Sequence, residues 1–201
     1  FLGEEYSASG IINGAFRAEG NLESPELGGE IEVGAEYLEL GLSDPIENLK
    51  GTINLSEGSA SIENLKGDFA EGSFEISGAI NLFDLENAWN LALSGQKLYF
   101  DYGSLVGNFD AELKFLGPLA APILEGELIP NDFVVGIPFE FPQSETDSDA
   151  FVPKINLDIR PGENVRVENE NMEIIVERGN LNLQFDNSLA DSLAMEGRLR
   201  S

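Results

Sequence analysis

The sequence predicts an all-β protein, and three observations lead to that fold class. Apolar and polar residues alternate in many short runs, which is the signature of a half-buried strand. Turn signals rich in glycine fall between these runs, and the chain has 22 glycines in total. Apolar residues at helical spacing are hard to find. We therefore expect about ten to fourteen strands, mostly antiparallel because they are joined in sequence by hairpins.

Four runs show the alternation most clearly. In Phe74 to Leu82 and in Phe109 to Phe115, apolar residues or glycine occupy every second position, and charged residues, small polar residues or alanine stand between them. Ile155 to Ile159 repeats the pattern, and Val165 and Val167 continue it. Because successive side chains of a strand point to opposite faces, each run predicts one apolar and one polar face.

Turn-forming residues divide the chain at short intervals. The predicted turns are Asn13-Gly14, Glu57-Gly58-Ser59, Glu71-Gly72-Ser73, Pro161-Gly162 and Arg178-Gly179-Asn180. One short helix is expected around Asp84 to Trp89, and the polar segment from Pro142 to Ala150 (residues 142–150), which has no periodicity, is expected to be a mobile loop.

The apolar parity changes once within a single run. Ile31 and Val33 are odd-numbered, whereas Leu38, Leu40 and Leu42 are even-numbered. A β-bulge adds one residue to a strand and so exchanges its two faces. The change near Tyr37 and Leu38 therefore predicts a bulge or a break between strands.

Internal repeats indicate an elongated stack of similar units. The hexapeptide IENLKG occurs at Ile46 to Gly51 and at Ile62 to Gly67, and each copy is followed by a Glu-Gly-Ser turn. A longer pattern, P-x-L-x-G-E-I/L, begins at Pro25 and at Pro122, with a weaker copy from Leu193 to Leu199. Units of this kind contact mainly their neighbours along the stack.

Composition excludes several classes of function. Asp and Glu number 37 against 11 Lys and Arg, for a net charge of −26, which repels phosphate and argues against nucleic acid as a partner. The chain has no Cys and no His, which removes disulfides, thiol nucleophiles, the usual zinc sites and every imidazole-based triad. We expect no catalytic residues, no metal and no cofactor. No run approaches the roughly 18 apolar residues of a membrane-spanning helix.

The repeats resemble the TamB family, the translocation and assembly module subunit of diderm bacteria, which is related to AsmA-like and chorein-like lipid-transfer proteins. The resemblance covers most of the chain. It rests on the segments at Pro25 and Pro122, on Gly72 to Leu82, and on Leu157-Asp-Ile followed by Asn164-Val-Arg-Val. The high acidity and the 142–150 segment depart from the family pattern.

The resemblance implies an elongated, curved sheet folded into an open hydrophobic groove, sometimes called a β-taco. It further implies a periplasmic segment, anchored through its parent protein in the inner membrane, that shields phospholipid acyl chains between the membranes and supports outer-membrane assembly with an Omp85-type partner. Residues 1–201 are then expected to be one β-groove domain, a fragment of a larger chain.

The predicted inner wall collects the apolar positions of the alternating runs. Its residues are Ile53, Leu55, Phe74, Ile76, Ile80, Phe109, Leu113, Phe115, Ile155, Leu157, Val165 and Val167. Sequence alone leaves open whether this wall lines an open groove or the dry core of a solenoid-like sandwich.

Two other functions remain open at this stage. A structural or adhesive β-stack would span distance or display a surface without binding lipid. A carbohydrate-active enzyme would need two carboxylates about 5 to 10 Å apart, for which Glu140 near Asp158 is one candidate pair. Asp147-Ser-Asp149 resembles the start of a calcium loop but lacks the glycine and the closing Glu.

Overall fold

A computed structural model describes residues 6–21, 24–40, 44–138, 153–186 and 193–200, and these form an all-β structure. Thirteen strands belong to one sheet, which confirms the predicted fold class and number of strands. Their bounds are β1 Tyr6–Asn21, β2 Ser24–Leu40, β3 Ile46–Ser56, β4 Ser59–Phe69, β5 Gly72–Asn81, β6 Trp89–Tyr102, β7 Leu105–Gly117, β8 Ile123–Gly136, β9 Lys154–Ile159, β10 Val165–Asn169, β11 Met172–Val176, β12 Arg178–Phe185 and β13 Leu193–Arg200.

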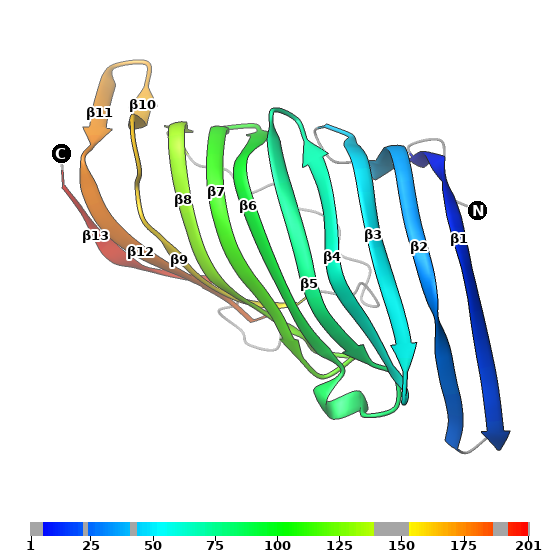
Figure 1. Ribbon diagram of the computed structural model, residues 1–201. Helices are drawn as coiled ribbons and strands as arrows, with labels where there is room; N and C mark the ends of the chain where they lie inside the picture. The colour runs from blue at the N-terminus through cyan, green and yellow to red at the C-terminus, as the bar shows by residue number, and fades with distance from the viewer. Residues whose placement is uncertain (1–5, 22–23, 41–43, 139–152, 187–192, 201) are drawn as a thin grey trace.

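The sheet is open and is not closed into a barrel. From β1 to β8 the strands lie side by side in chain order, each antiparallel to the next, as the hairpin-like turn spacing predicts. The sheet then curves, so that β9, β12 and β13 run obliquely to β1 in Figure 1. Among the described residues the main strand order ends at β1 and β13, each paired on one side only, and β11, which pairs only with β10, is a third outer strand.

The parallel pairings all involve β8. Its first half pairs with β9 and its end pairs with β10, both in parallel. Between them the chain still follows β8, because the Gly162 amide donates to the Pro130 carbonyl at 2.9 Å and the Asp132 amide donates to the Glu163 carbonyl at 2.8 Å. The predicted Pro161-Gly162 turn is therefore wrong: the two residues interrupt a strand that continues in the same direction.

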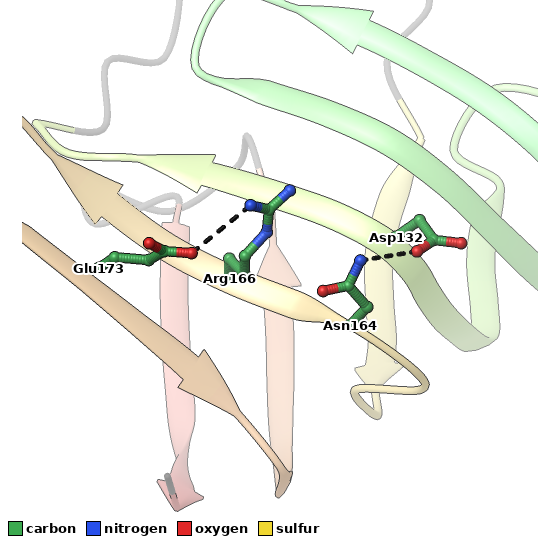
Figure 2. A network of polar contacts seen from close by, with 4 residues as sticks. All are labelled: Asp132, Asn164, Arg166 and Glu173. Atoms are coloured by element: carbon green, nitrogen blue, oxygen red, sulfur yellow. Dashed lines mark hydrogen bonds and ion pairs between the residues drawn. The ribbon is translucent and has the colours of Figure 1, made fainter.

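Polar side chains hold this interrupted strand in place. The Asn164 amide group donates to the Asp132 carboxylate at 2.7 Å, and the Arg166 guanidinium lies 3.5 Å from the Glu173 carboxylate of β11 (Figure 2). The first contact joins the start of β10 to β8, and the second joins β10 to β11. β10 is thus attached on both sides by side chains as well as by backbone pairing.

The other predicted turns divide into two groups. Glu57-Gly58-Ser59 lies at the β3–β4 reversal and Glu71-Gly72-Ser73 at the β4–β5 reversal, as expected. Asn13-Gly14 lies inside β1, and Arg178-Gly179-Asn180 lies inside β12, so both of those predictions are wrong. In both strands the glycine lies opposite a large apolar residue of the neighbouring strand, Ile31 or Leu199.

The expected helix is a single 3₁₀ turn, Leu85–Asn87, in the connection between β5 and β6. Its N-cap is Asp84, whose carboxylate accepts hydrogen bonds from the Glu86 and Asn87 amides at 3.2 Å. The Leu119 amide donates to the Leu85 carbonyl at 2.8 Å, which ties this turn to the connection between β7 and β8. The turn therefore joins two neighbouring connections at one end of the sheet (Figure 1).

Bulges bend five of the strands. In β2 the pairing passes from Tyr37 to Ala35 while β1 advances by one residue, so Glu36 is the extra residue and the predicted parity change is confirmed as a bulge. Similar shifts occur in β3, β4, β6 and β8. Three of these bulges contain a residue with positive φ: Asn48 at 52°, Lys97 at 53° and Asp132 at 46°. Such bulges increase local twist and bend the strand, which accounts for part of the curvature.

The described strands form a single layer. Their substantial contacts join hydrogen-bonded neighbours, and among described residues only eight hydrophobic side chains and Pro122 are buried. The whole chain exposes 13696 Å², whereas a compact monomer of its 21.8 kDa mass would expose roughly 9,300 Å². In the described residues no second sheet packs on the first, which argues against the sandwich alternative.

Candidate functional site

All twelve predicted wall residues lie on one face of the sheet. Residues that pair directly across neighbouring strands point to the same side, so the register can be followed from strand to strand. The connecting pairs are Ile53 with Ile62, Leu55 with Ala60, Ala60 with Ile80, Gly67 with Phe74, Leu65 with Ile76, Ile76 with Leu93, Leu93 with Leu113, Leu91 with Phe115, Leu98 with Phe109, Phe115 with Leu124, Leu124 with Ile155, Gly126 with Leu157, Val135 with Val167, and Val165 with Val176. We call this surface the apolar face.

In the strands that contain them, the bulges keep this face apolar along the whole strand. Without a bulge, Ile46 and Leu49 would point to opposite sides, because their spacing of three residues is odd. The extra residue Asn48 brings both to the apolar face, where Ile46 pairs with Leu38 and Leu49 pairs with Ala35. The Ile-x-x-Leu spacing of IENLKG is therefore a bulge signal, and it occurs in both copies of the hexapeptide.

Most of the twelve side chains are only half-buried. Leu157 and Val165 retain 7% and 6% of their exposure, whereas the other ten are of intermediate exposure. Their partial burial comes from neighbours on the same face. Trp89 meets Phe115 edge-on with ring centroids 5.1 Å apart, and Phe100 meets Phe109 in the same manner at 6.5 Å. The face is therefore well packed laterally and uncovered from above in the described residues.

Sequence reasoning missed a larger set of residues on the same face. The register adds Ile31, Val33, Leu49, Ile62, Leu91, Leu93, Leu98, Phe100, Leu124, Leu128, Phe133, Ile159, Leu181, Leu183 and Phe185. On the bulged strands a bulge shifts the phase of the alternation in mid-strand, and a parity count restarted after each three-residue apolar spacing would have found these residues. On β9 and β12, which have no bulge, plain alternation already marks Ile159, Leu181, Leu183 and Phe185 as residues of the same face.

Glycines make the apolar face smooth. Gly126 lies opposite Leu113, Gly78 opposite Leu91, and a Cβ added at either would collide with the backbone of that neighbouring strand. Gly67 lies opposite Phe74, whose ring would be 2.9 Å from an added Cβ. Large side chains therefore lie across glycines of the next strand and do not stand upright against a second layer.

The opposite face is polar. Lys66 of β4 lies 3.2 Å from Glu75 of β5, and the Ser94 hydroxyl donates to the Glu112 carboxylate at 2.8 Å. The phenol of Tyr37 donates to the Glu39 carboxylate at 2.8 Å, and this hydrogen bond raises the pKa of Tyr37 above its ordinary value because it favours the neutral phenol. The acidic residues are thus largely displayed away from the apolar face.

A shallow hollow of about 860 Å³ lies on this polar side over β2 to β6, of which β2, β3, β4 and β6 contain bulges. Its lining includes Lys50 and Lys66, one from each copy of IENLKG, together with Glu32, Asp68 and Glu75. Lysines and carboxylates alternate there, and Lys66 is already paired with Glu75. The hollow therefore has no concentrated charge of one sign to hold an ion.

The residues proposed for other chemistry do not form a site in the described part of the chain. Asp158 accepts a hydrogen bond from the Asn182 amide group at 3.1 Å, while Glu140 lies outside the described residues. Asp147-Ser-Asp149 and the 142–150 segment, expected to be mobile, also fall outside them. Among described residues, no group of three or more acidic side chains is placed to hold a metal ion.

Comparison of the chain with models of protein families, with curated proteins and with solved structures finds no match. Among the described residues there is no helix that is both long and apolar enough to cross a membrane.

Proposed function

We propose that this chain binds the acyl chains of lipids on its apolar face and guides them across successive strands. The observation that carries the proposal is the extent of that face, which runs through the sheet from β1 to β13 with no covering layer in the described residues. Contiguous apolar patches beyond a few hundred Å² are rare on soluble monomers and mark surfaces that take a partner or ligand.

Acyl chains suit this surface because it offers area without specific polar groups. Burial of one methylene contributes about 0.8 kcal/mol. An acyl chain that lies on the apolar face therefore gains affinity from its length alone. Headgroups would remain at the edge of the sheet in water. Movement along such a surface requires no catalytic residue, in keeping with a chain that lacks His and Cys.

The resemblance to the TamB family adds a cellular location and a partner to this proposal. In that setting the chain is a periplasmic segment of a longer protein anchored in the inner membrane, and the lipids are phospholipids on their way to the outer membrane. An Omp85-type protein would be the partner of the parent protein. These parts rest on the sequence resemblance, whereas the acyl-chain proposal rests on the apolar face.

Leu113 is the best position for a test, because it lies in the middle of the apolar face between Leu93 of β6 and Gly126 of β8. A photo-crosslinking amino acid at position 113 should capture a fatty-acid probe. The same group at Lys114, which is exposed on the polar face of the same strand, should capture little. Equal capture from both positions would contradict binding on this face.

A charge at the same position separates an open surface from a closed core. In Leu113→Arg the long side chain can lift its guanidinium into water, so we expect a loss of about 1–2 kcal/mol in unfolding free energy together with weaker lipid capture. A closed core would lose about 3–5 kcal/mol, because the charge would be buried without a partner. Urea unfolding and lipid capture are measured on the same preparation, and a folded variant with unchanged capture would count against the proposal.

A further inference from the structure

Two neighbouring connections at one end of the sheet expose large apolar side chains. In the β5–β6 connection Leu82, Phe83 and Leu85 are 38%, 50% and 54% exposed, and in the β7–β8 connection Leu119 is 42% exposed. Connections are normally built from small and polar residues. An exposed apolar cluster at this place therefore indicates a surface that meets a partner. We call these four residues the apolar tip.

Backbone hydrogen bonds hold the apolar tip in a fixed conformation. The Leu119 amide donates to the Leu85 carbonyl at 2.8 Å, which joins the two connections. The Leu82 amide donates to the carbonyl of Gly58, in the β3–β4 turn, also at 2.8 Å. Three neighbouring connections are thus tied together, and the tip presents its apolar side chains from a rigid base.

Side chains supply acceptors for further backbone amides of the tip. The side-chain oxygen of Asn81 accepts hydrogen bonds from the Phe83 and Asp84 amides at 3.0 and 2.9 Å. The Asp84 carboxylate in turn accepts from the Glu86 and Asn87 amides of the 3₁₀ turn. In lipid, backbone groups must find their partners within the protein. These amides already have such partners, so they lose none when the water around them is removed.

The apolar tip is continuous with the apolar face. Trp89, the first residue of β6, pairs with Ile80 of the predicted wall and meets the Phe115 ring edge-on at 5.1 Å. Its indole N–H donates to the Leu119 carbonyl at 3.4 Å. Trp89 therefore links the two surfaces. Tryptophan, with an apolar ring and a polar N–H, is enriched where membrane and water meet.

We propose that the apolar tip inserts into the surface of a lipid bilayer, so that acyl chains pass from one leaflet onto the apolar face. This rests on the proposed function, because the tip adjoins the surface that would bind those chains. A bilayer suits the tip for two reasons. The tip lies beyond the ends of β5 and β6 at one end of the sheet (Figure 1), and a fluid layer accepts projecting side chains without a matching shape.

Charge selects the kind of bilayer. Asp84 and Glu86 flank Leu85 in the tip, and the chain has a net charge of −26. Anionic lipids would repel this surface, whereas zwitterionic phosphatidylcholine would not. We therefore expect the chain to float with phosphatidylcholine vesicles in a density gradient. Added phosphatidylglycerol should weaken this binding at low salt, and added salt should restore it.

A charge placed in the tip tests the contact. Leu85→Glu should weaken binding to phosphatidylcholine vesicles by about tenfold or more, because burial of the leucine side chain is lost. The fold should be kept, since that side chain is 54% exposed. The matched control is Ile175→Glu on β11, where an apolar side chain of similar exposure, 56%, lies outside the tip. This control should bind vesicles like the unmodified chain.

Trp89 reports where the vesicle is bound, because it is the only tryptophan of the chain. Its emission should shift to shorter wavelength on addition of phosphatidylcholine vesicles. Vesicles of phosphatidylcholine with brominated acyl chains should quench it, since bromine quenches only at short range. Leu85→Glu should show neither change at the same lipid concentration.

Two variants separate this proposal from the proposed function. Leu85→Glu should still capture a fatty-acid probe from solution, but it should extract little of the same probe from vesicles. Leu113→Arg should bind vesicles normally and capture less probe from either source. If the unmodified chain binds vesicles but captures no probe from solution, the proposed function fails. If it captures the probe from solution but does not bind vesicles, the membrane contact alone fails.

Three further results would overturn the membrane contact. One is equal vesicle binding by Leu85→Glu and Ile175→Glu. Another is vesicle binding without quenching of Trp89, which would place the contact elsewhere on the chain. The third is self-association of the unmodified chain without lipid that Leu85→Glu abolishes. A second copy, and not a bilayer, would then cover the tip.

Discussion

Single glycines decide how the apolar side chains lie. Gly126 has φ at +143°, a conformation that other residues rarely adopt, and an added Cβ would collide with the Glu112 carbonyl. Leu113 can lie across this position only because no side chain occupies it. The glycines are therefore a requirement of the smooth single layer and not merely of its turns.

Gly126→Ala should accordingly lower the free energy of unfolding by about 2–3 kcal/mol, through backbone strain and displacement of β7. The control is Gly28→Ala. Gly28 is also in a strand, but its φ is ordinary and an added Cβ would come no closer than 3.9 Å to the Leu55 carbonyl oxygen. Urea unfolding of both variants measures the difference. Similar losses in the two would show that the collision at Gly126 does not govern its contribution, because the lower entropy of the unfolded chain in a Gly→Ala variant is by itself stabilising.

A second prediction at the scale of the residue concerns Asp84. The hydrogen bond from the Asn87 side chain, helped by the amides of Asn87 and Glu86, lowers the pKa of this carboxyl against a smaller opposing effect of desolvation. Because the pKa is lowered in the folded state, its stabilising effect is present above the ordinary carboxyl pKa and is lost as pH falls through the lowered value. Protection of the Glu86 and Asn87 amides from hydrogen exchange, expressed relative to the intrinsic exchange rate at each pH, should therefore fall in acid. In Asp84→Asn that acid-dependent loss of protection should disappear, and its persistence would contradict the assignment.

At the scale of the strand, each bulge removes backbone N–H or C=O groups from the hydrogen bonds between strands. These groups need other partners. At the β6 bulge the Lys97 amide donates to the Asp110 carboxylate of β7 at 2.8 Å. The other oxygen of the same carboxylate accepts a hydrogen bond from the Asn131 amide group of β8 at 3.3 Å. One side chain therefore connects bulge residues of two strands through the strand between them.

Asp110→Ala should cost about 1–2 kcal/mol because the Lys97 amide loses its acceptor. Asp110→Asn retains one oxygen acceptor and should lose less. Lys114→Ala, a change at an exposed residue on the same face of β7, serves as the control and should be nearly neutral. Chemical denaturation gives the three values. An Asp110→Ala variant as stable as Lys114→Ala would mean that water replaces the carboxylate at no cost.

Strand identity could be predicted from the sequence because alternation is a local property. Phe74 to Leu82 and Phe109 to Phe115 are strand-forming for reasons contained within each run. The bulge near Tyr37 could also be predicted, because the apolar residues are odd-numbered before it and even-numbered after it. These features require no knowledge of the neighbouring strands.

The antiparallel order of β1 to β8 could be predicted, but the places where the chain continues through turn-like residues could not, because they depend on which neighbour a segment meets. Pro161 and Gly162 are ordinary turn residues, yet the chain there continues along β8, whose carbonyls accept the Arg160 and Gly162 amides at 3.0 and 2.9 Å. Likewise Asn13-Gly14 has the composition of a hairpin turn but lies inside β1, where Gly14 accommodates Ile31. In both places a contact distant in sequence overrides the local preference.

At the scale of the whole molecule, a single layer must obtain its stability laterally. Side chains such as Leu113 are stabilised by neighbours within the same face, and the side that faces away from the sheet remains available. The predicted wall residues share that face, although sequence could not decide between an open surface and a closed core. The decision depends on whether a second layer exists, which is a property of the assembled strands and not of any one run.

An open apolar layer makes a quantitative prediction about ligand length. Each methylene that becomes buried contributes up to about 0.8 kcal/mol, or up to about a fourfold change in Kd. Affinity for a series of saturated fatty acids, measured by displacement of an environment-sensitive acyl probe, should therefore rise steadily with chain length. A preformed pocket of fixed size would instead give a sharp optimum and then a decline, because longer chains would no longer fit.

The headgroup offers the corresponding control. Because the headgroup would remain in water at the edge of the sheet, lysophospholipids with equal acyl chains but zwitterionic or anionic headgroups should differ only modestly, with the anionic lipid weaker at low salt owing to the net charge of −26. Added salt should remove that difference and leave the dependence on chain length intact, since burial of methylenes is not screened. Affinity that follows headgroup charge and ignores acyl length would place binding on the polar side, at the hollow between Lys50 and Lys66, and would contradict the apolar face as the functional surface.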